Sequence, residues 1–222
     1  MSELAQNSSV SDLYNRHRDE SCFIVGSGSS LLQDMEHLGR LQDRLTFVPS
    51  RLMLWKDIPF TPTYHLLAEL VHINHRHTYY WPGVRERFLV THRPRDEEGW
   101  TYVPKADNAY YVMQHGLKGL GKKFEPFTNG RSAVCTALQL AMWMGCTTAY
   151  ILGCELTNTG HAWNVGDTRN DVTLGHKLDA WKRAAADMKK AGRTLIDCTI
   201  DGNLSKHGVV DYMPLKDALD AT

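Results

Sequence analysis

The sequence predicts an α/β fold, with a mostly parallel sheet and helices on both of its faces. Short apolar runs that end at glycine or in a polar loop alternate with segments of helical periodicity, which is typical of parallel sheets. The 222 residues suit one domain, and 42% hydrophobic with 23% charged residues is the composition of a globular protein. We expect residues 1–20 to form a polar lead-in and residues 21–222 a single domain.

The apolar runs place the strands in order along the chain. They predict strands at 22–25, 45–48, 64–70, 87–91, 109–114, 148–152 and 194–197, of which 64–70 is equally compatible with a short helix. Apolar residues at helical spacing predict helices over 31–41, 133–144 and 214–219, and an amphipathic helix marked from Leu178 that ends at Gly192. The helix at 133–144 is apolar on all sides, which predicts that it is buried.

Composition and charge exclude several classes of protein. No apolar run approaches the ~20 residues of a membrane span, and the first residues lack a signal pattern, so we expect a cytoplasmic protein without membrane contact. Lys plus Arg equals Asp plus Glu at 25 each, which argues against nucleic-acid binding by overall charge but allows a local basic patch. Five cysteines without a Cys-x-x-Cys pair predict buried thiols and no metal site.

Two glycine-containing turns precede predicted helices and have the form of anion sites. The first is Gly26-Ser27-Gly28-Ser29-Ser30, whose backbone N–H groups and following helix favour a phosphate, although a plain tight turn explains the same residues. The second comprises Gly130, Arg131 and Ser132. Arg131 either clamps a phosphate or is a surface arginine, and Ser132 is either a ligand contact or a helix N-cap.

A carboxylate and a polar loop follow the strand at 148–152. Glu155 stands where open parallel sheets bind ligands, and it either contacts a ligand or accepts hydrogen bonds from nearby backbone amides. In the loop, Thr157, His161 and Trp163 offer groups that bond sugar hydroxyls and phosphates. We expect any lid over the site to lie within residues 155–174. His176, placed just ahead of the next helix, is either a general base or a surface histidine.

Residues 72–95 interleave cations with aromatic rings. The segment holds five arginines and four histidines against one acidic residue. Such a pattern suits nucleic acid or another phosphorylated acceptor, while a mixed solvated surface explains it equally well. The candidate acceptor-binding residues are Arg76, Tyr79, Tyr80, Trp81 and Arg85.

Three blocks of the sequence together resemble one superfamily. They are CFIVGSGSSL, NGRSAVCTALQLAMWMGCTTAYILGCEL and the closing stretch that begins GHKLDAWKRAAADM. These blocks are similar to the family-42 bacterial sialyltransferases, to the motility-accessory-factor glycosyltransferases and to the methanogen-type hydroxymethylpterin pyrophosphokinases. They cover the first ~30 residues and nearly all of 129–219, whereas residues 50–128 match poorly.

The resemblance implies a Rossmann-like, GT-A-variant glycosyltransferase that binds a nucleotide-activated donor and needs no metal or other cofactor. It places Gly26, Ser27, Gly28 and Ser30 along the nucleotide, with Gly130 and Ser132 beside it. It also places Glu155 at the ribose or base, and His176 as general base. Thr157 and Trp163 stand where the sialyltransferases have phosphate-binding tyrosines, and Ser29 replaces a loop proline, so the sugar and the donor nucleotide are left open.

The sequence therefore predicts a glycosyltransferase that moves a sugar from a nucleotide-activated donor to an acceptor hydroxyl. The sequence does not identify the acceptor, which could be a polymer such as hydroxymethylated DNA of the phage type. It also leaves the linkage and the oligomeric state undetermined. One alternative is an ATP-dependent pyrophosphokinase of a pterin-like alcohol, with a divalent metal on carboxylates such as Glu155 or Asp167. Another is a nucleotide-binding module without catalytic activity.

Overall fold

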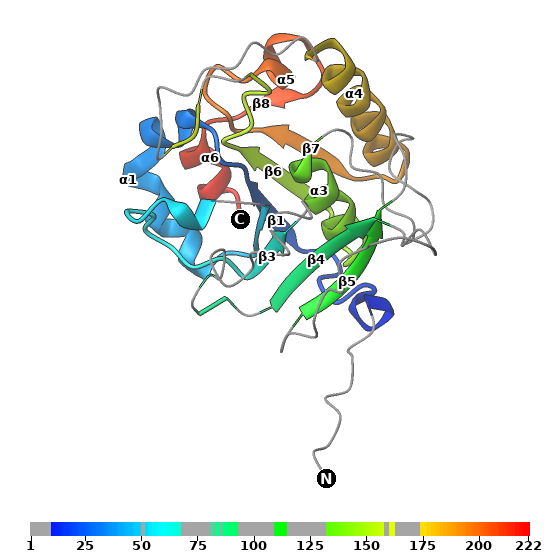
Figure 1. Cartoon of the computed structure of the whole chain (residues 1–222). Coiled ribbons are helices and arrows are strands. Elements are labelled where there is room, and N and C mark those ends of the chain that lie inside the picture. The colour runs from blue at the N-terminus through cyan, green and yellow to red at the C-terminus, as the bar shows by residue number, and fades with distance from the viewer. Residues whose placement is uncertain are drawn as a thin grey trace, which may run out of the picture.

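An eight-stranded sheet forms the centre of the computed structural model (Figure 1), with the strand order β5-β4-β3-β2-β1-β6-β7-β8. The structure describes residues 10–49, 52–67, 81, 83–84, 86–92, 109–114, 132–157, 160–162 and 174–222. The strands are β1 (Ser21–Val25), β2 (Thr46–Pro49), β3 (Tyr64–Leu67), β4 (Glu86–His92), β5 (Ala109–Gln114), β6 (Thr148–Leu152), β7 (Thr194–Asp197) and β8 (Asp211–Tyr212). Each pairing between neighbouring strands is parallel, which confirms the predicted α/β class.

Helices cover both faces of the sheet (Figure 1). The α-helices are α1 (Met35–Leu38), α3 (Ala133–Trp143), α4 (Leu174–Lys190), α5 (Asn203–Lys206) and α6 (Leu215–Asp220), and the 3-10 helices are η1 (Val10–Leu13), η2 (Ser29–Asp34), η3 (Gly39–Asp43) and η4 (Leu52–Leu54). Successive side chains of β1 enter different cores: Cys22 and Ile24 pack with α3 and α4, and Phe23 and Val25 pack with α1 and α6. A strand buried on both faces must be apolar throughout, as this run is.

The order of the strands reverses beside β1. From β1 the chain adds β2 to β5 on one side, and then returns through α3 to add β6, β7 and β8 on the other side. Open parallel sheets bind ligands at the carboxyl ends of strands where the order reverses in this way. The fold therefore points to the loops that follow β1 and β6.

Several segments differ from the sequence-based predictions. The helix predicted over 31–41 is divided into η2, α1 and η3. The short elements η4, α5 and β8 were not predicted; β8 has two exposed residues and gives no apolar run. The helix α4 begins at Leu174, so His176 lies within its first turn and not ahead of the helix.

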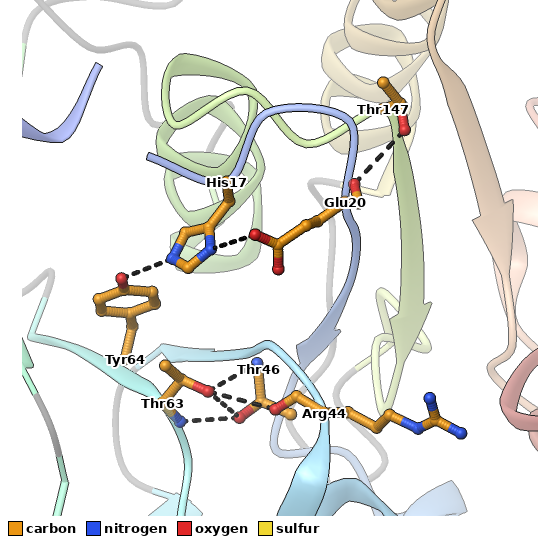
Figure 2. Close-up of polar contacts among 7 residues, drawn as sticks. All are labelled: His17, Glu20, Arg44, Thr46, Thr63, Tyr64 and Thr147. Carbon is orange, nitrogen blue, oxygen red and sulfur yellow. Dashed lines mark hydrogen bonds and ion pairs between the residues drawn. The ribbon is translucent and has the colours of Figure 1, made fainter. Parts of the chain in front are cut away.

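The described part of the lead-in, residues 10–20, packs against the domain. Leu13 is fully buried in the core that includes α3. Backbone N–H groups of the lead-in donate to carbonyls at the end of α3, for example His17 to Met144 at 2.6 Å. Figure 2 shows His17 between Tyr64 and Glu20, with its Nε2 at 2.7 Å from the Tyr64 hydroxyl and its Nδ1 at 3.1 Å from a Glu20 carboxylate oxygen. Residues 10–20 are thus part of the folded unit.

Two further findings concern predictions from composition. All five cysteines are buried and form no disulfide, as predicted. Within the ranges that the structure describes, no helix is both long enough and apolar enough to cross a bilayer.

Candidate functional site

A cavity of about 300 Å³ lies at the carboxyl ends of β1, β2 and β6. Its walls are formed by residues 26–28, 132–134 and 153–157, together with Pro49, Gly160, His161 and Lys177. The cavity therefore adjoins the strands at which the order of the sheet reverses, and its volume is at the lower end of the ~300–1,000 Å³ typical of small-molecule sites. Three segments that the sequence singled out, far apart along the chain, meet here.

The glycine-rich loop after β1 binds an anion, and this anion is the carboxylate of Glu155. The backbone N–H of Ser30 donates a hydrogen bond of 2.6 Å to Glu155 Oε1. A side chain at position 28 would displace this carboxylate, because a Cβ on Gly28 would lie 1.5 Å from Glu155 Oε2. The sequence left two roles open for Glu155, and the structure shows one of them, the hydrogen bond from a nearby backbone amide. Glu155 also lines the cavity, where a ligand contact is a proposal.

The backbone around Glu155 is held by residues that follow β7. The Asn203 side chain donates to the Glu155 carbonyl oxygen at 2.8 Å, and the Cys154 N–H donates to Thr199 Oγ1 at 3.2 Å. Leu156, the next residue, has a φ of 57°, a left-handed conformation that costs an L-residue ~1–2 kcal/mol. Strain of this kind persists only where the surrounding structure enforces it, and it is concentrated at functional sites.

A buried carboxylate organises the loop that supplies these contacts. Asp197, at the end of β7, is fully buried and accepts hydrogen bonds from the N–H of Thr199 at 2.9 Å and of Ser205 at 3.1 Å. Sequence reasoning did not single out Asp197, Thr199 or Asn203. The available signal was the polar residue that ends a predicted core strand, the same signal that identified Glu155.

Residues 160–162 lie against the glycine-rich loop. His161 Nδ1 is 3.1 Å from Ser27 Oγ, and the Ala162 N–H donates to the Ser27 carbonyl oxygen at 3.0 Å. Gly28 and His161 also form an isolated antiparallel bridge. The structure therefore joins His161 to the predicted nucleotide loop and places its imidazole in the cavity wall.

The amino end of α3 forms another wall of the cavity. Ser132 Oγ accepts a hydrogen bond of 3.3 Å from the Val134 N–H, so Ser132 is the N-cap of this helix, and it also lines the cavity. The predicted partners Gly130 and Arg131 lie outside the described residues. Thr157 lines the cavity with an exposed side chain, whereas Trp163 lies outside the described ranges.

In the first turn of α4, Lys177 lines the cavity and His176 does not. Lys177 is in phase with the buried residues Trp181 and Ala184, which lie four and seven positions further along α4 on the face that packs on the core. Successive residues of an α-helix are rotated by about 100°, so His176 is turned away, and it is exposed. Sequence reasoning missed Lys177, although its helical phase could have identified it.

The environment of Cys154 reveals the charges around the cavity. Burial raises the pKa of the Cys154 thiol well above its usual value, the carboxylates of Glu155 and Asp197 act in the same direction, and Lys177 opposes them. A raised pKa disfavours the thiolate, which is the nucleophilic form of cysteine. Cys154 packs in the core that includes α3 and α4.

The proposed acceptor segment is described only in part. Trp81 is buried at 5% exposure, with its ring centroid 5.6 Å from that of His65 and 6.5 Å from that of Phe60. It packs in the core and presents almost no surface to an acceptor. The other predicted acceptor residues, Arg76, Tyr79, Tyr80 and Arg85, lie outside the described ranges.

Comparisons with known proteins do not assign the chain to a family. No protein-family model matches the sequence, and no curated protein matches it. Fold and site together define an α/β protein with a parallel sheet and a cavity where the strand order reverses. Among the described residues, no group of three or more His, Cys, Asp or Glu side chains is placed to hold a metal ion; Asp167, a candidate ligand under the pyrophosphokinase alternative, is not among them.

Proposed function

We propose that the protein is a Rossmann-like glycosyltransferase, which moves a sugar from a nucleotide-activated donor to an acceptor hydroxyl. The observation that carries this proposal is the cavity beside β1, β2 and β6, whose wall combines Glu155, His161 and Lys177 with the amino end of α3. Nucleotides bind at this place in open parallel sheets. The cavity can accommodate a hydroxyl-rich and anionic ligand because it offers both acceptors and positive charge.

Each of these groups has a role in the proposed reaction. Glu155 has acceptor capacity beyond the bond from Ser30, since a carboxylate accepts about four hydrogen bonds, and this capacity suits the hydroxyls of a ribose. Thr157 offers a hydroxyl from the same wall. His161 is the described imidazole in the cavity wall, so it takes the acceptor proton in this proposal, a role that the resemblance gives to His176.

Titration of the chain with nucleotides and nucleotide sugars tests the proposal. Thermal unfolding with each compound is the first step, because a ligand at ~100 times its dissociation constant adds about 2.7 kcal/mol to the stability. Compounds that stabilise the chain are then incubated with acceptors, and the released nucleotide is measured. We expect one base to bind selectively and its sugar conjugate to turn over. If no nucleoside or nucleotide of any base binds, the proposal is wrong.

A nucleotide-binding module without transferase activity is the second candidate. The exposure of His176 outside the cavity favours it, because the base implied by the resemblance does not line the cavity. Tight binding without turnover of any donor would support this candidate. The pyrophosphokinase alternative predicts chelator-sensitive consumption of ATP in the same titrations.

The identity of the acceptor is a separate proposal. One candidate is a hydroxymethylated base in phage-type DNA. It depends on the basic and aromatic residues of 72–95, whose cation side chains are not described. Binding to DNA through phosphates must weaken steeply with salt. A chain that does not bind DNA, or whose binding does not change with salt, would contradict a DNA acceptor.

A further inference from the structure

The two charged side chains of the cavity wall, among the residues that the structure describes, stand on different elements. Glu155 follows β6 and is bound to the glycine-rich loop through the Ser30 N–H, whereas Lys177 belongs to α4. The loop that resembles a phosphate cradle is thus already next to a negative charge. A phosphate placed on the Ser30 amide would be repelled by the Glu155 carboxylate.

The helix dipole disfavours a cation at the position of Lys177. This residue lies in the first turn of α4, where the dipole favours negative charge. A lysine on the face that packs against the core also loses hydration that its neighbour Lys182, exposed on the same helix, retains. Lys177 also lowers the pKa of the Cys154 thiol, in the loop after β6, against the larger effect of burial.

The amino end of α3 adds positive potential to the same cavity. Residues 132–134 form part of its wall, and α3 is an 11-residue helix whose dipole is positive at its amino end. Ser132 Oγ there accepts a hydrogen bond from the Val134 N–H, so the helix end acts through its dipole. Lys177 and this helix end therefore make one side of the cavity favourable to an anion, while Glu155 makes the glycine-rich side unfavourable.

We propose that Lys177, together with the amino end of α3, binds the phosphate of the cavity's ligand, and that the ligand therefore lies with its phosphate toward α3 and α4. This inference rests on the proposed function for the identity of the ligand as a nucleotide-activated sugar. In the transfer, the bond from the sugar's anomeric carbon to the phosphate oxygen breaks, and its electron pair stays on the phosphate. The acceptor oxygen forms the new bond, and its proton passes to the base. Lys177 offsets the charge that the phosphate gains.

Calorimetric titration with a nucleoside, its monophosphate and its diphosphate tests the inference in the whole chain. The variants are Lys177→Met, Lys177→Arg and the matched control Lys182→Met, which removes the same charge from the exposed face of α4. We expect Lys177→Met to lower the affinity for the phosphorylated ligands by about 10–100-fold, the effect of losing one charge-assisted bond. The affinity for the nucleoside should stay within about twofold of the wild-type value. Lys177→Arg retains most of the affinity, and Lys182→Met changes neither.

Inorganic pyrophosphate separates this inference from the proposed function. Pyrophosphate could stabilise the wild-type chain against unfolding but not Lys177→Met, while no nucleoside or nucleotide binds. This result would support the phosphate site and contradict the transferase. If nucleotides and nucleosides bind with equal affinity, and Lys177→Met changes neither affinity, the inference is wrong and a nucleotide site is still present. Equal weakening of nucleoside and nucleotide by Lys177→Met would also overturn it. Absence of binding to any of these compounds would overturn both.

Discussion

Glu155 and Ser30, 125 residues apart in the sequence, are joined by a hydrogen bond of 2.6 Å from the Ser30 backbone N–H to the Glu155 carboxylate. This contact connects the loop after β1 to the loop after β6, at the two strands between which the order of the sheet reverses. The glycine-rich loop therefore takes its shape around a group of the protein itself.

Replacing Glu155 by Ala should lower the free energy of unfolding by about 1.5–3 kcal/mol, because the Ser30 N–H loses a charged acceptor. Glu155→Gln keeps an amide oxygen as acceptor and should cost less. Without the carboxylate, phosphate or sulfate should stabilise Glu155→Ala more than the wild type, as the loop becomes free to bind an external anion. Urea unfolding with and without these ions measures both effects. The exposed Glu36 provides the control Glu36→Ala, for which little change is expected.

A methyl group at Gly28 should displace the Glu155 carboxylate. The Cβ of Gly28→Ala would lie 1.5 Å from Glu155 Oε2, so the carboxylate must leave the loop and the bond to Ser30 is lost. We expect a cost of about 1–3 kcal/mol in the wild type and much less in the Glu155→Ala background. Costs that add fully in the double variant would show that position 28 and Glu155 do not interact.

Asp34 should make stability fall as the pH rises. It is 8% exposed, and burial raises the pKa of its carboxyl above 3.8, with a smaller contribution from Glu36 against an opposing one from His37. The folded state therefore holds the proton more tightly than the unfolded state, so this contribution is present below the unfolded pKa and is lost as the pH rises through the folded pKa. Asp34→Asn should stabilise the protein at pH 7 and have little effect near pH 3. A difference that is constant with pH would contradict this, and the exposed Asp217 supplies the control Asp217→Asn.

Removing the Tyr64 hydroxyl should loosen the lead-in. The hydroxyl is buried and lies 2.7 Å from His17 Nε2 (Figure 2). Tyr64→Phe should cost about 0.5–1.5 kcal/mol and increase hydrogen exchange at the His17 amide, which donates to Met144. Tyr212→Phe, on a 48% exposed ring, should stay within about 0.5 kcal/mol. Equal effects of the two variants would mean that the His17 contact contributes nothing.

Two histidine variants decide which imidazole acts as the base in the proposed transfer. His161→Ala should lower kcat by about 10²–10⁴-fold, and His176→Ala should leave it within about twofold, because His161 lines the cavity and His176 does not. Nucleotide affinity and the circular dichroism spectrum confirm that each variant is folded. The opposite result would restore the role that the sequence resemblance gives to His176.

Much of the fold was predictable because β1 and β6 are buried along almost their whole length and β7 is buried at two of its four positions. Buried parallel strands must be apolar, so the sequence shows them directly, and the predicted strands at 148–152 and 194–197 have the bounds of β6 and β7. β8 was not predictable by this signal, since its two residues are exposed and it pairs only along the backbone of β7.

The candidate site was predictable as a set of loops but not as a set of contacts. The positions of the glycine-rich loop, Glu155 and Ser132 follow from strand ends and a helix start. That Glu155 enters the glycine-rich loop depends on how two loops 125 residues apart meet, which no local pattern encodes. The choice between His176 and Lys177 depends on the phase of α4, which its packed residues indicate. That phase was not applied to positions 176 and 177, because the helix was predicted to begin after them, whereas it begins at Leu174.

The orientation of α4 about its axis directs two neighbouring residues of different chemistry to different surroundings: Lys177 lines the cavity, and His176 is exposed to solvent. Deleting Lys177 itself, while Trp181 and the other packed residues of α4 kept their places, would bring His176 to the same wall. The loss of this single codon is therefore enough, in this architecture, to replace a fixed positive charge by a group that can accept a proton.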